Sequence, residues 1–230
     1  MKTTWLGHGT FKFTTSSGHV VLVDPWVGGN PACPPDQKNF DRLDAMLITH
    51  GHFDHIGDAV EIAKKHQPKI VGIYELCAWL ESKGVANTSP MNKGGTQQVL
   101  DWSVTMVTAD HSCGILDDGK IVYGGEAVGY VIRAEGKCLY YAGDTNVFGD
   151  MKLIAELYAP EVAFLPIGDL FTMGPKEASA ACRMLGARTV IPMHYATFPL
   201  LTGTPAALRG LLQGTTIEVR DLQPGQTISL

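Results

Sequence analysis

The chain of 230 residues is 45% hydrophobic and 18% charged, which excludes a disordered chain and is ordinary for a globular enzyme. Its formal net charge of −5 argues against a protein dedicated to long nucleic acid, because such a protein needs a basic face to neutralise phosphates. The five cysteines are scattered without CxxC spacing and predict neither a disulfide framework nor a zinc finger. With no signal peptide within residues 1–15 and no run long enough for a membrane span, we expect a cytoplasmic protein.

The opening third of the sequence is predicted to form strands. Short β-branched or aromatic runs cut by glycines indicate strands at residues 4–6, 11–14 and 19–23. The last of these is continuously apolar from Val20 to Val23, as in a strand buried on both faces. Prolines and glycines then predict a long loop over residues 25–40. Beyond that loop we expect a helix at 58–66, a strand at 69–73 and a helix at 74–83.

The second half of the chain repeats this alternation of strands and helices. Its expected strands lie at residues 97–100, 104–108, 121–123, 127–134, 138–141, 162–166, 189–193, 217–220 and 227–229, with 121–123 and 127–134 forming a hairpin-like pair. Its expected helices lie at 151–157, 175–185 and 205–212. Groups of strands followed by strand–helix alternation, twice over, predict an α/β fold of two mixed sheets stacked face to face with helices outside. We expect one domain, residues 1–230, built from two similar halves at about 1–110 and 111–230.

The most informative segment is Thr49-His50-Gly51-His52-Phe53-Asp54-His55, which directly follows an apolar run. Imidazole and carboxylate groups bind divalent transition metals. His50 and His52 are two residues apart, so at an extended strand end they point the same way and can share one metal. Asp54 and His55 follow in the turn, where the chain can direct them toward a second metal. The segment therefore predicts half of a site for two metals.

Three further candidate ligands each follow a predicted strand. His111 comes after the strand at 104–108, Asp144 after the strand at 138–141 and His194 after the strand at 189–193. The carboxyl ends of strands are where sites gather in α/β proteins, because the loops there converge on one edge of the sheet. Together with the first segment, these residues complete a set of seven candidate ligands.

The order of these motifs resembles the metallo-β-lactamase superfamily. The residues of the individual motifs are similar to those of a group of small metal-dependent hydrolases within this superfamily. That group is related to the ascorbate-6-phosphate lactonases. Five motifs carry this second resemblance: Trp5-Leu6-Gly7-His8, Val23-Asp24-Pro25, Tyr141-Ala142-Gly143-Asp144-Thr145, Leu165-Pro166-Ile167-Gly168-Asp169 and Pro192-Met193-His194-Tyr195. They extend over nearly the whole chain and are specific for the fold and the metal site rather than for the substrate.

The resemblance implies an αββα sandwich with two metals in a groove at one edge of the sheets. One ion would be held by His50, His52 and His111. The other would be held by Asp54, His55 and His194. Asp144 would bridge the two ions, about 3.5–4 Å apart, so that they share a hydroxide that attacks the substrate. Histidine-rich ligands favour zinc, and the mixed set also suits manganese, iron or nickel.

Five other residues have both a functional and a structural interpretation. His8 either contacts the substrate or a metal-bound species, or closes a turn. Asp24 either orients a ligand histidine through its distal N–H or caps a turn. Asp169 either protonates a leaving group near the metals or caps the helix at 175–185. Tyr195 either donates to a substrate oxygen or packs as an aromatic ring, and Cys113 is expected to be a small packed residue rather than a redox group.

We therefore predict a metal-dependent hydrolase that attacks a small-molecule ester or lactone or a phosphodiester, with Asp54, Asp144, His8 and Asp169 as candidate catalytic residues. One alternative is a phosphodiesterase for cyclic or short nucleotides. A second is an iron-dependent oxidoreductase of the same fold, although those versions usually carry a glutamate where this chain has Phe53. A third is a metal-dependent binding protein without turnover. A small-molecule partner is expected, long nucleic acid and membranes are not, and a homo-oligomer is left open.

Overall fold

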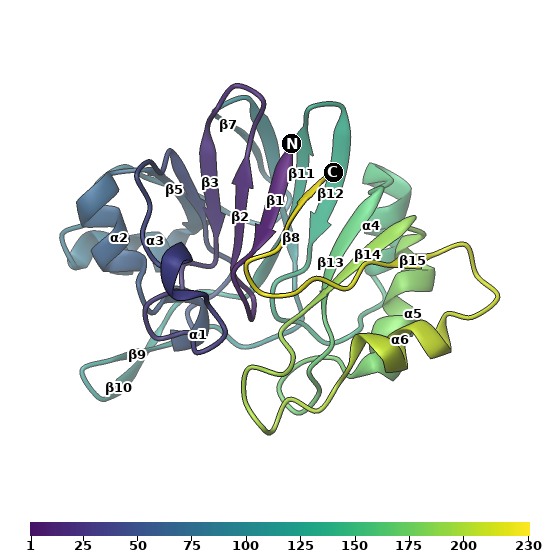
Figure 1. The fold of residues 1–230 in the computed structure, drawn as a ribbon. Coiled ribbons are helices and arrows are strands. Elements are labelled where there is room, and N and C mark those ends of the chain that lie inside the picture. The colour runs from purple at the N-terminus through teal and green to yellow at the C-terminus, as the bar shows by residue number, and fades with distance from the viewer.

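The computed structural model describes residues 1–230 and contains two seven-stranded β-sheets packed face to face, with helices on the outer faces (Figure 1). This confirms the predicted αββα architecture. No helix is both long and apolar enough to cross a membrane. The loops at the lower edge of the molecule in Figure 1, around α1 and below β13 and β14, come from both sheets.

The first sheet contains, in spatial order, β16 (Thr227–Ser229), β1 (Lys2–Trp5), β2 (Phe11–Thr14), β3 (Val20–Val23), β4 (Ala45–Leu47), β5 (Lys69–Ile73) and β6 (Thr88–Met91). The second contains β15 (Glu218–Val219), β14 (Thr189–Met193), β13 (Val162–Pro166), β12 (Lys137–Tyr141), β11 (Val128–Ala134), β8 (Trp102–Thr108) and β7 (Thr96–Val99). The chain thus changes sheet between β6 and β7, and its last strand returns to the first sheet beside β1 (Figure 1).

Both sheets repeat one pairing pattern. In the first, β16, β1, β2 and β3 pair antiparallel and β3 to β6 pair parallel. In the second, β7, β8, β11 and β12 pair antiparallel and β12 to β15 pair parallel. The change from antiparallel to parallel therefore falls on β3 and on β12. An aspartate follows each of these strands, Asp24 and Asp144, and such switch points are where open sheets form binding crevices.

Five helices cover the outer faces of the sheets. Helices α2 (Ala59–His66) and α3 (Tyr74–Ser82) lie beside the first sheet, and α4 (Met151–Tyr158), α5 (Pro175–Leu185) and α6 (Pro205–Leu211) lie beside the second (Figure 1). Helix α5 shows why these segments are helical. Pro175 occupies its first turn, its buried face is lined with small and apolar residues, and Gly186 ends it in the left-handed conformation with φ of 64°.

Aromatic side chains fill the space between the two sheets. The Phe164 ring of β13 lies 4.9 Å from the Phe11 ring and 5.7 Å from the Phe13 ring, both on β2. All three side chains are fully buried. Near the lower edge, the Tyr130 hydroxyl donates to the Ile48 carbonyl across the sheets at 2.7 Å. These contacts fix the two sheets relative to each other and hence fix the loops at their shared edge.

The structure corrects several details of the predicted elements. The strand β10 (Lys120–Tyr123) does not form a hairpin with the strand that follows it. It pairs with β9 (Gly114–Asp117), which the sequence did not predict, in a separate two-stranded hairpin. The strand β6 was not predicted from the sequence. The short helix α1 (Phe53–Ile56) lies where a turn was predicted. A 3₁₀ turn, η1 (Pro35–Gln37), interrupts the predicted loop at 25–40.

Candidate metal centre

All seven predicted ligands lie together at the lower edge of the sheets. They come from the segment after β4 together with α1, from the loop after β8, from the loop after β12 and from the end of β14: His50, His52, Asp54, His55, His111, Asp144 and His194. The convergence follows from the topology, because the strands that carry these loops all end at this edge. Two separate groups of side chains can be distinguished by their distances.

The first group consists of His50, His52 and His111. The Nδ1 atom of His52 lies 3.1 Å from Nε2 of His50 and 3.3 Å from Nε2 of His111. The other ring nitrogen of His52, Nε2, lies 3.2 Å from the Ser112 hydroxyl. His52 therefore faces the group with Nδ1, whereas His50 and His111 face it with Nε2.

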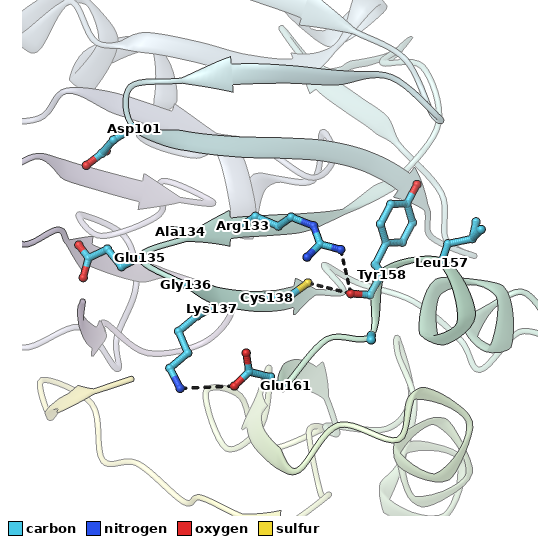
Figure 2. Close-up of a pocket in the computed structure, with 11 residues that line it drawn as sticks. Asp101, Arg133, Ala134, Glu135, Gly136, Lys137, Cys138, Leu157, Tyr158 and Glu161 are labelled. Atoms are coloured by element: carbon cyan, nitrogen blue, oxygen red, sulfur yellow. Dashed lines mark hydrogen bonds and ion pairs between the residues drawn. The ribbon is translucent and has the colours of Figure 1, made fainter.

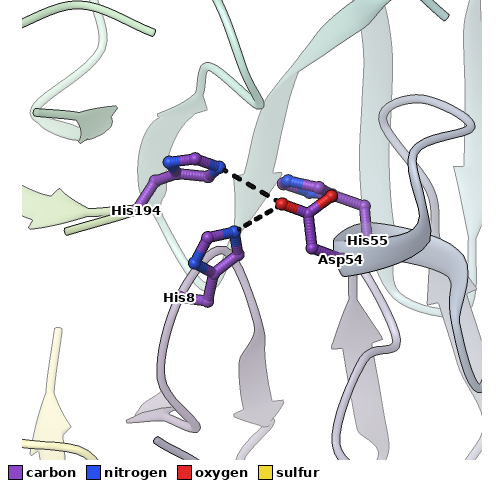
Figure 3. Close-up of side chains that lie close together, drawn as sticks. All are labelled: His8, Asp54, His55 and His194. Atoms are coloured by element: carbon purple, nitrogen blue, oxygen red, sulfur yellow. Dashed lines mark hydrogen bonds and ion pairs between the residues drawn. The ribbon is translucent and has the colours of Figure 1, made fainter. Parts of the chain in front are cut away.

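The second group consists of Asp54, His55 and His194, with His8 beside them (Figure 3). The Asp54 carboxylate lies between two imidazoles: its Oδ2 is 3.0 Å from Nε2 of His8 and 3.7 Å from Nε2 of His194. The His55 and His194 rings are nearly parallel, with centroids 5.6 Å apart. Asp54 and His55 are neighbours in α1, so this short helix delivers two of the side chains at once.

Asp144 joins the two groups through a single oxygen atom. Its Oδ2 lies 3.8 Å from Nε2 of His50 and 3.7 Å from Nε2 of His111, both in the first group. The same oxygen lies 3.3 Å from Nε2 of His55 and 3.0 Å from Nε2 of His194, both in the second. A carboxylate in this position contacts both groups of histidines and keeps them at a fixed separation.

The electrostatics of the cluster suit divalent cations. Burial holds the pKa of His50 well below its ordinary value, with His55 adding to the effect, so His50 is neutral and has a free lone pair. Burial alone would lower the pKa of His194, but the Asp144 carboxylate together with that of Asp54 outweighs burial and raises that pKa to about 9. Burial would raise the pKa of Asp144, yet His194 and His55 hold it well below its usual range. The ionised carboxylates therefore stabilise positive charge in the cluster, and bound metal ions can supply that charge.

Unsatisfied buried atoms point the same way. The His55 Nε2 atom, both ring nitrogens of His194 and the Asp144 Oδ1 atom are buried and have no hydrogen-bond partner of acceptable geometry. Buried polar atoms are normally paired, because leaving one without a partner costs about 1–3 kcal/mol. His55 Nε2 and His194 Nε2 point into the cluster beside Asp144, so ions bound there would satisfy them. The residues therefore fit a pair of divalent metals.

A buried hydrogen-bond network orients two of these histidines. Asp24 Oδ2 lies 2.9 Å from Nδ1 of His55, which leaves His55 Nε2 facing the cluster. The Thr49 backbone N–H and hydroxyl both donate to Asp24 at 2.8 Å. Since the Thr49 hydroxyl proton is used there, its oxygen accepts from His50 Nδ1 at 3.0 Å. This favours the orienting role of Asp24, whereas the matching role of Thr49 was not predicted from the sequence.

His8 occupies a buried position behind the cluster. Its ring has no exposed surface in this structure, and its predicted contact with a substrate stays a prediction. Its Nε2 contacts Asp54 and its Nδ1 lies 3.0 Å from the Thr197 hydroxyl. Burial, followed by the charge of His194, lowers the pKa of His8 to about 4, so the ring is neutral. His8 is placed to hold Asp54 in position.

Asp169 is not brought to the cluster. It is exposed, has a left-handed φ of 69°, and its carboxylate accepts a hydrogen bond from the Leu170 backbone N–H at 2.8 Å. It does not line the hollow above the cluster. Tyr195 also points away, because its hydroxyl donates to Asp221 at 3.1 Å. Cys113 is buried, as expected, and its thiol donates to the Gly124 carbonyl at 3.1 Å.

A hollow of about 870 Å³ lies over the cluster. Its floor is formed by His52, Asp54, His111, Asp144 and His194. Its walls are apolar and come from α1, the β9–β10 hairpin and the loops after β13 and β14: Phe53, Leu116, Ile121, Phe171, Phe198 and Leu200. The volume matches that of typical small-molecule sites, which are about 300–1,000 Å³.

A second, shallower hollow of about 560 Å³ lies at the opposite end of β12, around its turn with β11 (Figure 2). Its charged side chains already contact protein groups. Lys137 lies 3.3 Å from Glu161, Arg133 donates to the Tyr158 carbonyl at 3.0 Å, and Glu135 lies 2.7 Å from the amino terminus of Met1. This hollow holds no group of metal-binding side chains, and the cluster at the lower edge is therefore the candidate site.

The fold and the cluster define a protein of the β-lactamase superfamily, and a family model described as "Beta-lactamase superfamily domain" matches residues 19–195. The chain is 59% identical over 229 residues to a UPF0173 metal-dependent hydrolase from Solibacter usitatus, covering 99% of both chains. It is 47% identical over 229 residues to another from Methanopyrus kandleri, again covering 99% of both. The solved structure of the metallo hydrolase Igni18 from Ignicoccus hospitalis aligns with a TM-score of 0.87 and 35% identity, covering 99% of this chain and 97% of that one.

This chain belongs to the UPF0173 metal-dependent hydrolase family. The predicted membership of the metallo-β-lactamase superfamily is confirmed. The closer relation to ascorbate-6-phosphate lactonases stays a prediction, as do the individual ligands, the kind of metal and the substrate.

Proposed function

We propose that this protein hydrolyses a small molecule at a centre of two divalent metals, zinc being the first candidate. One ion would be held by His50, His52 and His111. The other would be held by Asp54, His55 and His194. Asp144 would bind both ions. Two ions bound there would lower the pKa of a shared water to near neutrality and polarise the group under attack.

The position of Asp144 Oδ2 carries this proposal. It lies 3.0–3.8 Å from the Nε2 atoms of four histidines, two from each group. A purely structural aspartate needs one or two donors. An oxygen surrounded by four imidazole nitrogens, of which those of His55 and His194 have no hydrogen-bond partner, is better explained by cations between them.

The chain's own residues perform three tasks in this proposal. Asp24 and Thr49 fix the ring orientation of His55 and His50, so that each presents Nε2. His8 donates its Nε2–H to Asp54 and thereby keeps that carboxylate ionised and aimed at its group. A substrate lying against the apolar walls would exclude bulk water from the floor, which strengthens every electrostatic interaction there.

Metal analysis combined with one substitution tests the proposal. Protein purified without chelator should contain close to two divalent ions per chain and should hydrolyse at least one chromogenic ester or phosphodiester. Asp144→Ala should lose turnover and metal while keeping the far-ultraviolet circular dichroism of the parent. The matched control is the exposed Asp150→Ala, which should change neither. An Asp144→Ala protein with two ions and full turnover would refute the two-metal mechanism.

A further inference from the structure

The hollow above the cluster has an unusual combination of walls and floor. Five of the seven candidate metal ligands lie on its floor, whereas large apolar side chains from both halves of the chain surround its mouth. Several of these are left in water: Phe53 is 60% exposed, Phe171 57%, Leu200 61%, Leu116 66% and Ile121 80%. A monomer seldom gathers so many exposed apolar side chains in one place unless that place binds something apolar.

The same hollow lacks fixed positive charge. No lysine or arginine lines it, and outside the cluster its one side chain with a hydrogen-bonding group is the Ser112 hydroxyl. Recognition of a phosphate or carboxylate away from the metals requires a cation, most often an arginine that binds it with two hydrogen bonds. A nucleotide or a phosphorylated sugar would therefore place an unpaired charge or several hydroxyl groups against apolar walls, and either is unfavourable.

We propose that the substrate is an uncharged carboxylic ester or lactone whose apolar acyl or aryl portion lies between the β9–β10 hairpin and the loops after β13 and β14. In the reaction, water adds to the carbonyl carbon and the bond from that carbon to the leaving oxygen breaks. The products are a carboxylate, a proton and an alcohol, and for a lactone the carboxylate and the hydroxyl group remain in one molecule. This inference rests on the proposed hydrolytic function and selects the ester or lactone class over the phosphodiester class.

A chain-length series tests the inference. Metal-loaded protein is assayed with p-nitrophenyl acetate, p-nitrophenyl hexanoate and the anionic bis(p-nitrophenyl) phosphate, each rate being divided by its uncatalysed rate. Because each buried methylene favours binding, kcat/KM for hexanoate should exceed that for acetate by about tenfold. The corrected phosphodiester rate should be the lowest of the three.

Two matched substitutions show where the preference arises. Leu116 in the wall and Leu157 on α4 are both 66% exposed, so Leu116→Lys and Leu157→Lys place the same charge at equally exposed positions. Leu116→Lys should abolish the preference for hexanoate and weaken binding of the neutral dye Nile red, which we measure separately by fluorescence. Leu157→Lys should leave both unchanged.

The possible failures can be told apart. Equal rates for acetate and hexanoate, or a phosphodiester preferred after correction, would overturn the substrate inference while Asp144-dependent turnover still supported hydrolysis. If the apolar wall is instead an interface between copies of this chain, Leu116→Lys would change the mass in light scattering and leave the chain-length preference intact, which also overturns it. If the parent protein contains no metal and hydrolyses none of the substrates, the proposed function itself is refuted.

Discussion

The ring of His8 is completely buried, and its Nε2 lies 3.0 Å from the Oδ2 of Asp54, a residue 46 positions further along the chain. The His8 backbone is held in the left-handed region with φ of 56°, which is uncommon outside glycine. Its carbonyl also accepts the backbone N–H of His194 at 3.1 Å. His8 therefore connects two candidate ligands of the second group without being exposed to the hollow.

His8→Ala is expected to weaken metal binding rather than substrate binding. Removing the donor leaves the Asp54 carboxylate without a fixed partner, and comparable losses around metal ligands cost about 10–100-fold in metal affinity. Competition with a chromogenic chelator measures the affinity for the weaker ion. His8→Gln, which keeps a donor, should recover part of it. An unchanged affinity with a raised KM would instead assign His8 to the substrate.

Gly9→Ala is expected to disturb the second group of ligands by a steric clash with the His55 ring. A Cβ atom at Gly9 would lie 2.7 Å from Cε1 of the buried His55 ring, so the ring must shift. We expect a loss of about 1–3 kcal/mol in unfolding free energy, as for other overpacked cores, and a smaller rise in Tm on adding metal. Gly149→Ala is the control, because a Cβ there meets nothing within 4 Å. An undiminished metal-induced rise would show that His55 stays in place.

The sequence predicts the metal cluster better than the surroundings of the cluster. Ligands such as His50 and His52 are recognisable because they are close in sequence, and His111, Asp144 and His194 because each follows an apolar strand. The contact between His8 and Thr197 spans 189 positions and no local pattern reports it. The role of Asp24 was open between orienting and capping until its partners Thr49 and His55 were in view.

The walls of the hollow were also beyond local sequence reasoning. The run at Ile121–Tyr123 looks like a strand of a main sheet, and only the pairing of β10 with β9 shows that it projects from the fold as a separate hairpin. Asp169 illustrates the opposite case, in which a recognisable motif does not fix where a side chain points. Its motif resembles the family pattern, yet the left-handed backbone at Asp169 and Leu170 turns the carboxylate toward its own loop.

Phe164→Ala should test how far the aromatic layer stabilises both sheets. The ring contacts Phe11 and Phe13 across the interface, and its removal leaves a cavity at the centre of the core. We expect a loss of about 3–5 kcal/mol in the free energy of unfolding, measured by urea denaturation of metal-free protein. Tyr123→Ala, at a side chain that is 71% exposed, should cost far less. A loss of less than about 1 kcal/mol would mean that the layer repacks around the gap.

The buried thiols give a prediction about pH. Burial raises the pKa of Cys77 and of Cys182 from 9.0 to about 12, so the native protein holds both as neutral thiols at pH 8. Since the thiolate is the reactive form, iodoacetamide should label the native chain slowly and the urea-unfolded chain rapidly. A raised pKa stabilises the native state fully below pH 9.0, and this contribution is lost as the pH rises toward 12. Urea midpoints of metal-free protein should therefore fall between pH 9 and 11, and less steeply in Cys182→Ala; an identical fall in both proteins would contradict the assignment.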